Sequence, residues 1–231
     1  MAIARRAARP APADLDTRAR ILAAATEVFV RRGIEAGTIR EITDAASVNV
    51  AAVNYHFGSR EALLREVLAA AAGPMNAARL LALDQAAAAH APHAPPLPAI
   101  VDALVRPLVQ APRWQDGTRP LIRLIQQLRA LPHGLANRLM AEQFDAVAQR
   151  FIAAFQAALP QLSRAEIVWR YEFARGAVVH VLADCDPESG RLAALSGDAC
   201  RTGEEAELLA QATAFVAAGF LAPGGSRTAG T

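Results

Sequence analysis

The amino-acid sequence predicts an all-α protein, and three observations support this. Alanine is the commonest of the 231 residues, and it has the highest helix propensity. No segment alternates apolar and polar residues in the way that a half-buried strand does. Apolar residues recur instead at helical spacing, as in the stripe formed by Ile21, Leu22, Ala25, Val28 and Phe29.

Capping residues divide the first part of the chain into short helices. A first helix is expected over residues 17–32, followed by a glycine stop signal. Thr38 can cap a second helix, because Glu41 follows three residues later, as in a capping box. A short third helix is expected over residues 49–57, and Ser59 can cap a fourth.

We expect the rest of the chain to be helical too, with breaks where Pro and Gly cluster. The expected helices cover residues 60–89, 99–111, 121–131, 135–158, 163–183 and 204–221. Segments 90–98, 111–120 and 184–203 are expected to be loops.

The segment SVNVAAVNYHFGSREALL, residues 47–64, raises the question of what its polar side contacts. On a helix that starts at Asn49, Val53 and Phe57 are four residues apart and face inward. Asn54, Tyr55 and His56 then face a partner. Two short helices joined by a tight turn fit a helix-turn-helix, whose second helix lies in the DNA major groove.

The residues that we expect to contact DNA are small, carry hydrogen-bonding side chains or lie at the start of a helix. They are Thr38, Asn49, Val50, Ala51, Ala52, Asn54, Tyr55, His56 and Arg60. Tyr and His suit phosphate oxygens, helix N-termini attract phosphate, and small apolar residues can contact thymine methyls. The alternative is that Tyr55 and His56 are ordinary surface or half-buried residues. Arg60 can instead pair with an acidic neighbour, the choices being Glu61, Glu66 and Asp44.

The charge distribution is compatible with this hypothesis without requiring it. The net charge is +2, but residues 1–65 hold ten Arg and seven acidic residues, whereas the remainder holds fourteen Arg and fifteen acidic residues. Arg5, Arg6 and Arg9 can reach a minor groove or simply keep the start of the chain solvated. Arg18 and Arg20 are expected to solvate the first helix, the alternative being that one of them touches phosphate.

Several classes of protein are not predicted. No run of about 20 uncharged apolar residues is present, and the first residues lack the apolar core of a secretory signal, so we expect a cytoplasmic protein without a membrane partner. There is no Gly-rich phosphate loop, G-x-S-x-G or H-E-x-x-H, so we expect no catalytic residues, metal or cofactor. Cys185 and Cys200 lack metal-binding spacing, and two free thiols are expected, with a disulfide as the alternative.

The stretch TIREITDAASVNVAAVNYHFGSREALL resembles the N-terminal domain of the TetR family of transcriptional regulators. That family shows T-x-x-x-I-A-x-x-A-G-V-S, then a recognition helix ending in Y-x-H-F or Y-Y-H-F, then S-K-E and Leu. The matching positions are Thr38, Ile42, Ala46, Val48, Tyr55, His56, Phe57, Ser59, Glu61 and Leu63. Ser47 stands where Gly is usual, so a positive φ is expected there.

The resemblance implies a homodimeric one-component regulator, a repressor, that binds a palindromic double-stranded DNA operator and is released by a small-molecule effector. The chain would then comprise a disordered basic arm at residues 1–14, the helix-turn-helix domain at 15–72, a ligand-binding and dimerisation domain at 73–223 and a flexible tail at 224–231. The alternative function is a helical small-molecule-binding protein without DNA-binding activity. A damaged third helix would indicate this alternative, whereas the third helix of this sequence is intact.

The C-terminal domain offers polar residues for a ligand pocket: Trp114, Arg119, Arg123, Gln126, Gln127, Arg175 and His180. His180 is alternatively a hydrogen-bonded core residue, and Arg123 with both glutamines is alternatively a solvated face.

Two apolar stripes run along the helix 163–183. One comprises Ile167, Tyr171, Ala174, Val178 and Leu182, and the other comprises Trp169, Phe173, Ala177 and Val181. A helix that is apolar on two sides is buried on both, so one stripe can face the core and the other a partner subunit. The expected dimer interface comprises Tyr171, Ala174, Val178, Leu208, Ala212, Phe215 and Gly219; the alternative is that both helices complete a monomer core.

Overall fold

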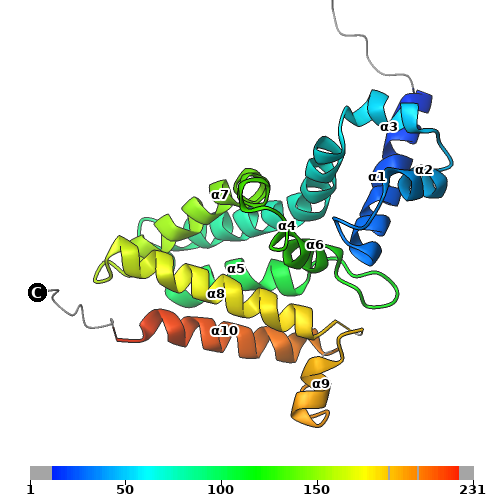
Figure 1. Ribbon diagram of the computed structural model, residues 1–231. Helices are drawn as coiled ribbons and strands as arrows, with labels where there is room; N and C mark the ends of the chain where they lie inside the picture. The colour runs from blue at the N-terminus through cyan, green and yellow to red at the C-terminus, as the bar shows by residue number, and fades with distance from the viewer. Residues whose placement is uncertain (1–11, 187, 202, 224–231) are drawn as a thin grey trace, which may run out of the picture. The chain divides into compact units, whose positions relative to one another are not determined.

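The computed structural model describes residues 12–223 apart from 187 and 202, and across these residues the secondary structure is helical with no strand (Figure 1). The all-α prediction is therefore confirmed. The helices are α1 (Pro12–Arg32), α2 (Ile39–Ala46), α3 (Val50–Phe57), α4 (Arg60–His90), α5 (Leu97–Val109), α6 (Pro120–Leu128), α7 (His133–Ala158), α8 (Arg164–Asp184), α9 (Arg191–Ser196) and α10 (Glu205–Leu221). In this described part of the chain, no helix is both long and apolar enough to cross a bilayer.

Two expectations about the chain's course were wrong. Helix α1 begins at Pro12 rather than near Thr17, so the last residues assigned to a disordered arm are helical. Proline suits the first turn of a helix, because its missing N–H would have no partner there. The expected loop 184–203 contains α9, a short helix with no buried residue between Gly190 and Gly197. Residues 1–11 and 224–231, which hold the rest of the arm and the tail, lie outside the described residues.

The chain forms two compact units, Met1–Ala70 and Ala71–Thr231, and α4 contributes to both. Pro74 lies inside α4 just beyond this boundary, where it removes one intrahelical hydrogen bond. The first unit holds α1 to α3 and the start of α4. Its core is made of fully buried side chains, among them Ile21, Phe29, Ile42, Leu63 and Val67.

The connection between α1 and α2 is held by Arg60, the first residue of α4. Its guanidinium donates hydrogen bonds to the carbonyl oxygens of Ile34 and Gly37, and it lies 5.3 Å from the ring centroid of Phe29. Gly37 itself has no room for a side chain, because a Cβ there would lie 2.8 Å from Cγ1 of Val28. The expectation that Arg60 contacts DNA or pairs with an acidic neighbour is therefore corrected: its charge is used inside the first unit.

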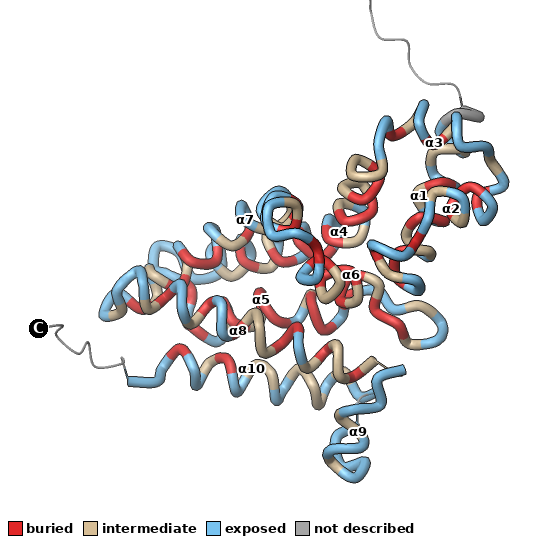
Figure 2. The backbone as a smooth tube through the Cα atoms, viewed as in Figure 1, coloured by how far each residue is buried: buried red, intermediate tan, exposed pale blue. Residues whose placement is uncertain are grey.

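In the second unit, α5 is buried along most of its length (Figure 2) and contacts α7 and α10. Helices α8 and α10 lie side by side, and α8 also contacts α6 and α7 (Figure 1). The phenyl rings of Phe155 on α7 and Phe220 on α10 stack with their centroids 4.0 Å apart, which joins these helices across the core.

Arg79 of α4 is one of two charged side chains that the described part of the second unit buries, the other being Arg119. Arg79 of α4 is only 5% exposed, and its Nε donates to the carbonyl oxygen of Leu104 at 2.8 Å. Burial lowers its pKa to about 10. The guanidinium is therefore held in the core by a backbone carbonyl oxygen, the acceptor for its Nε.

Replacing Arg60 with Met should destabilise the α1–α2 connection. The carbonyl groups of Ile34 and Gly37 would lose a charged donor, and such hydrogen bonds contribute about 1–3 kcal/mol. Hydrogen exchange measured segment by segment should show the opening free energy of α1 and α2 reduced by that amount.

The matched control is Arg20→Met, because Arg20 makes only an exposed pair with Asp16 at 3.4 Å and a weak bond to Thr17. Exposed pairs contribute at most about 1 kcal/mol. Equal protection of α1 and α2 in the two variants would contradict the structural role of Arg60.

Candidate functional site

Helix α2 is fixed at its start by the predicted capping box. The backbone N–H of Glu41 donates to Oγ1 of Thr38 at 3.2 Å, and the backbone N–H of Thr38 donates to the Glu41 carboxylate at 2.8 Å. These hydrogen bonds from Thr38, with a smaller contribution from Arg32, lower the pKa of Glu41. The prediction of this cap is confirmed.

The turn between α2 and α3 passes through a left-handed residue. Ser47 has φ 53° and ψ 50°, as its place in the sequence predicted. The N–H of Val48 donates to the carbonyl of Thr43 at 3.0 Å, which closes the end of α2. Asn49 then caps α3 by accepting a hydrogen bond from the N–H of Ala52 at 2.9 Å. Together these contacts set where α3 begins.

Helix α3 buries one narrow side. Val53 and Phe57 are 2% and 8% exposed, as expected from their spacing. The guanidinium of Arg18 lies 5.0 Å from the Phe57 ring centroid and pairs with Glu66 at 3.0 Å. Arg18 therefore supports the buried side of α3 and does more than solvate α1.

The opposite side of α3 is open to solvent. Tyr55 is 76% exposed, Val50 is 49% exposed, Asn54 is exposed and His56 is half-buried. The rings of Tyr55 and His56 meet edge to face with centroids 5.0 Å apart. Thr38, Asn49 and Ala51 are also exposed, and Ala52 is half-buried. Apart from Arg60, the residues expected to contact DNA thus lie on or beside the surface of α2 and α3.

The second unit contains a cavity of about 330 Å³ between α6, the end of α8 and the segment that follows α8. It is lined by Arg119, Ile122, Arg123, Gln126, Gln127, Leu182, Ala183, Asp186, Glu188 and Ser189. Four of the predicted pocket residues therefore share one cavity.

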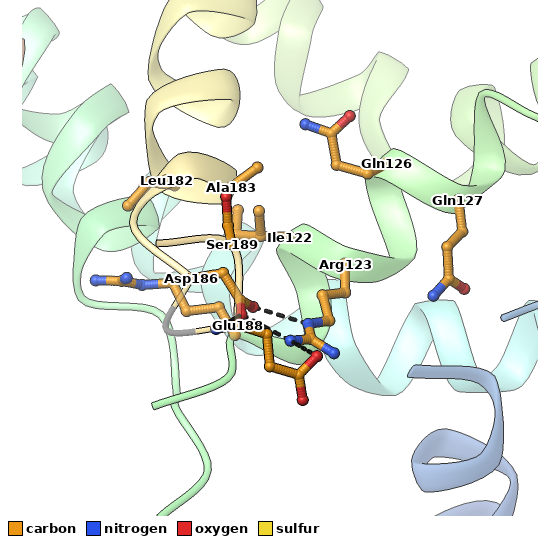
Figure 3. A pocket seen from close by; sticks show the side chains of 10 residues that line it. Ile122, Arg123, Gln126, Gln127, Leu182, Ala183, Asp186, Glu188 and Ser189 are labelled. Atoms are coloured by element: carbon orange, nitrogen blue, oxygen red, sulfur yellow. Dashed lines mark hydrogen bonds and ion pairs between the residues drawn. The ribbon is translucent and has the colours of Figure 1, made fainter. Parts of the chain in front are cut away.

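An ion-pair network forms one wall of this cavity. Figure 3 shows Arg123 between Asp186 and Glu188. Its guanidinium donates to both carboxylate oxygens of Asp186 at 2.7 and 2.6 Å and to Glu188 at 2.7 Å. The Arg123 guanidinium holds the pKa of Asp186 below its usual value. Arg123 is thus neither a solvated side chain nor a free cation. The acidic partners were missed in the sequence because they lie in a segment expected to be a plain loop.

The other predicted pocket residues lie elsewhere. The backbone of Trp114 closes a tight loop by hydrogen bonds with Thr118 and Gly117. Arg175 pairs with Glu172 on the same helix. The side chain of His180 is 73% exposed and lies 3.6 Å from Asp184, so both interpretations of His180, as a pocket residue and as a core residue, were wrong.

The assignment of the dimer interface on α8 was also wrong. Tyr171, Ala174 and Val178 are at most 6% exposed and face the core of their own unit. The other stripe is the open one: Trp169 and Phe173 are 64% and 67% exposed, and their rings stack at 5.7 Å. Periodicity revealed two apolar stripes but did not distinguish the one that the protein itself covers.

Helix α10 shows the same division. Leu208 and Ala212 are half-buried against the core, whereas Phe215 is 66% exposed and Gly219 is exposed. A hollow between α8 and α10 is lined by Trp169 and Phe173 together with Gly219. Phe215 lies one helical turn before Gly219, on the same side. We call Trp169, Phe173, Phe215 and Gly219 the outer face.

The structure describes both cysteines as free thiols, with Cys185 buried and Cys200 exposed. Burial raises the pKa of Cys185. The expectation of two free thiols is confirmed.

Comparison with known proteins matches both units to one family. The family description "Bacterial regulatory proteins, tetR family" matches residues 21–67, and "Tetracyclin repressor-like, C-terminal domain" matches residues 102–219. The chain is 38% identical over 65 residues to the HTH-type transcriptional repressor KstR2 of Rhodococcus jostii. It is 39% identical over 61 residues to the uncharacterized HTH-type transcriptional regulator TtgW of Pseudomonas putida. These matches cover 26% of this chain, and they span 31% and 46% of the two relatives.

Solved structures share the fold over most of the chain. A regulatory protein of the tetR family from Rhodococcus has a TM-score of 0.60 at 20% identity, covering 88% of this chain and 96% of that one. The TetR family regulator PfmR from Thermus thermophilus has a TM-score of 0.52 at 18% identity, covering 89% and 100%. Because the C-terminal family description alone matches just over half of the chain, and the N-terminal one matches its helix-turn-helix, this chain belongs to the TetR family of bacterial transcriptional regulators.

Proposed function

We propose that this protein is a homodimeric transcriptional repressor that binds a palindromic DNA operator through α3 and is released by a small organic effector bound in its second unit. The observation that carries the proposal is the open side of α3, where Tyr55 is 76% exposed while Val53 and Phe57 alone attach the helix to its core. A helix held in this way can enter a major groove without losing its packing.

The open side of α3 suits both kinds of DNA contact. Tyr55 and His56 carry donors for phosphate oxygens, and the starts of α2 and α3 present backbone N–H groups to phosphate. Val50 and Ala51 are exposed near the start of α3, where apolar side chains can contact thymine methyls. Because α3 has no Lys or Arg, base recognition depends on shape and uncharged groups.

Homodimerisation is supported by the outer face. Large apolar side chains on two neighbouring helices are open to solvent, and monomeric proteins rarely leave such a patch uncovered. A second copy placed against it by a twofold axis would give a four-helix interface from α8 and α10. Twofold symmetry in the protein also matches the two half-sites of a palindromic operator.

Effector release requires a difference in affinity between two states. A ligand displaces the repressor only if it binds the DNA-incompetent conformation more tightly. Operator and effector must then weaken each other's binding by the same factor. The cavity beside α6 and α8 is the proposed effector site, because buried polar groups and apolar side chains meet there.

A helical effector-binding protein without DNA-binding activity is less well supported, because both caps and the buried side of α3 are intact. We also propose that the protein is not an enzyme and acts in the cytoplasm, where operator DNA lies. A gel shift with palindromes from the DNA that flanks its coding region tests the function directly. Failure to bind any of them above non-specific affinity would favour the alternative.

Replacing Tyr55 with Phe should weaken DNA binding by about two- to tenfold, because one hydrogen bond contributes about 0.5–1.5 kcal/mol. The loss should be equal for operator and random DNA, since phosphate carries no sequence information. The slope of affinity against salt should not change, because the lost hydroxyl is uncharged. Fluorescence anisotropy with labelled duplexes measures all three quantities.

The matched control is Tyr171→Phe, which removes a hydroxyl from the second of the two tyrosines, a residue buried in the other unit. Its DNA affinity should equal that of the unchanged protein. If Tyr55→Phe also binds as tightly as the unchanged protein, Tyr55 does not touch phosphate.

Replacing Phe173 or Phe215 with Arg should give monomers, because an unpaired charge buried in an apolar interface costs several kcal/mol. Operator affinity should fall with the dimer. Leu81→Arg is the control, since Leu81 is 59% exposed on α4, outside the outer face. Sedimentation velocity should show dimers for this control, and dimers in all three variants would remove the outer face from the interface.

A further inference from the structure

The two arginines of the cavity beside α6 differ in their direct contacts with carboxylates. Arg123 is saturated by two carboxylates, those of Asp186 and Glu188. Arg119 is the second arginine of the cavity. Arg113 repels it electrostatically and is itself paired with Glu205. Within the described part of the chain, no carboxylate forms an ion pair with Arg119, although Glu205 and Asp186 attract it from farther away. The cavity therefore has one buried guanidinium that no carboxylate contacts directly.

Arg119 is also poorly hydrogen-bonded. It is only 3% exposed, and its terminal nitrogen donates to the carbonyl oxygen of Val109 at 3.3 Å, which is long for a charged donor. Its Nε is buried without any partner. Burial, reinforced by repulsion from Arg113, lowers the pKa of Arg119. Keeping a guanidinium in this state opposes folding, since buried charges are normally paired.

The rest of the lining is consistent with a ligand that has an apolar body. Ile122 and Leu182 are buried apolar side chains beside Arg119, and Ala183 follows on α8. Figure 3 shows Gln126 on the same helix as Arg123, one turn closer to the end of α6. A volume of about 330 Å³ is near the lower limit of ligand pockets, which begin at roughly 300 Å³.

We propose that the effector is a small organic monocarboxylic acid whose carboxylate pairs with Arg119 and whose short apolar chain packs against Ile122 and Leu182. The proposal rests on the proposed function in one respect, namely that this cavity is the effector site. A planar guanidinium matches a carboxylate bidentately, and such a pair would give Arg119 the carboxylate contact that it lacks.

The same lining sets the preferred charge of the ligand. Asp186 and Glu188 stand in the cavity wall, and both contact Arg123 rather than Arg119. A monocarboxylate supplies the contacting carboxylate that Arg119 lacks, whereas a second carboxylate would lie near Asp186 and Glu188 with no further cavity arginine to pair with. Dicarboxylates and phosphate esters of similar size should therefore bind more weakly than monocarboxylates.

The test is calorimetry and thermal shift on the full chain with straight-chain monocarboxylates of about four to eight carbons, their primary amides and the matching dicarboxylates, a size range set by the small cavity. At least one monocarboxylate should bind and raise Tm, and its amide and its dicarboxylate should bind about ten- to hundredfold more weakly, as expected for a lost charged hydrogen bond. This comparison uses the unchanged protein, so it does not depend on the folding of any variant.

Arg119→Gln should reduce affinity for that acid by the same factor and leave the amide unaffected. Arg106→Gln is the control, because Arg106 pairs with Asp102 on the exposed side of α5 and lines a different hollow. Absence of binding by every monocarboxylate, equal binding of acid and amide, or an unchanged affinity in Arg119→Gln would each overturn the proposal.

Operator binding measured without any acid separates the two hypotheses. If the protein binds operator but no monocarboxylate, the effector proposal fails and the repressor function stands. If a monocarboxylate binds through Arg119 but no operator is bound, the effector proposal stands and the repressor function fails.

Discussion

The position of α3 depends on two side chains. A helix of eight residues is too short to persist in water by itself, so its conformation comes from the Asn49 cap and its direction from Val53 and Phe57. Phe57 is in turn covered by the guanidinium of Arg18. Successive residues of a helix are about 100° apart around its axis, so Tyr55 lies on the side opposite Val53 and Phe57. A small rotation of α3 about the line that joins those two residues would therefore turn Tyr55 away from its present direction. The direction in which α3 presents Tyr55 therefore depends on how firmly Val53 and Phe57 are packed.

The arginines of the first unit show why charge alone was a weak guide to the DNA surface. Arg18 supports Phe57, and Arg60 holds the carbonyls of the α1–α2 connection, so both use their charge within the fold. Helix α3 has no Lys or Arg of its own. Under the proposed function, contact of α3 with a polyanion would use hydroxyl, imidazole and backbone donors placed by the fold, and these are directional rather than long-range.

Local geometry could be predicted from the sequence, whereas the partner of each surface could not. The caps at Thr38 and Asn49 and the positive φ at Ser47 follow from neighbouring residues, and the structure has all three. The two stripes of α8 are both apolar at helical spacing, and only the packing of the other helices shows that Tyr171 is inside and Trp169 outside. His180 and Arg60 were misplaced for the same reason, because burial and long-range contacts are properties of the assembled unit.

Helix α8 connects the two proposed surfaces of the second unit. Its inner stripe belongs to the core, its outer stripe carries Trp169 and Phe173, and its last turn lines the cavity through Leu182 and Ala183. A packed helix moves largely as a rigid body, because interiors do not deform continuously. A ligand that neutralises Arg119 changes the electrostatics at the end of α8, so any resulting shift of this helix also displaces the outer face. Such a shift can regulate DNA binding only if the protein binds the ligand with different affinity in the two positions of α8. The guanidinium of Arg119, which no carboxylate contacts directly, supplies a physical source for that difference.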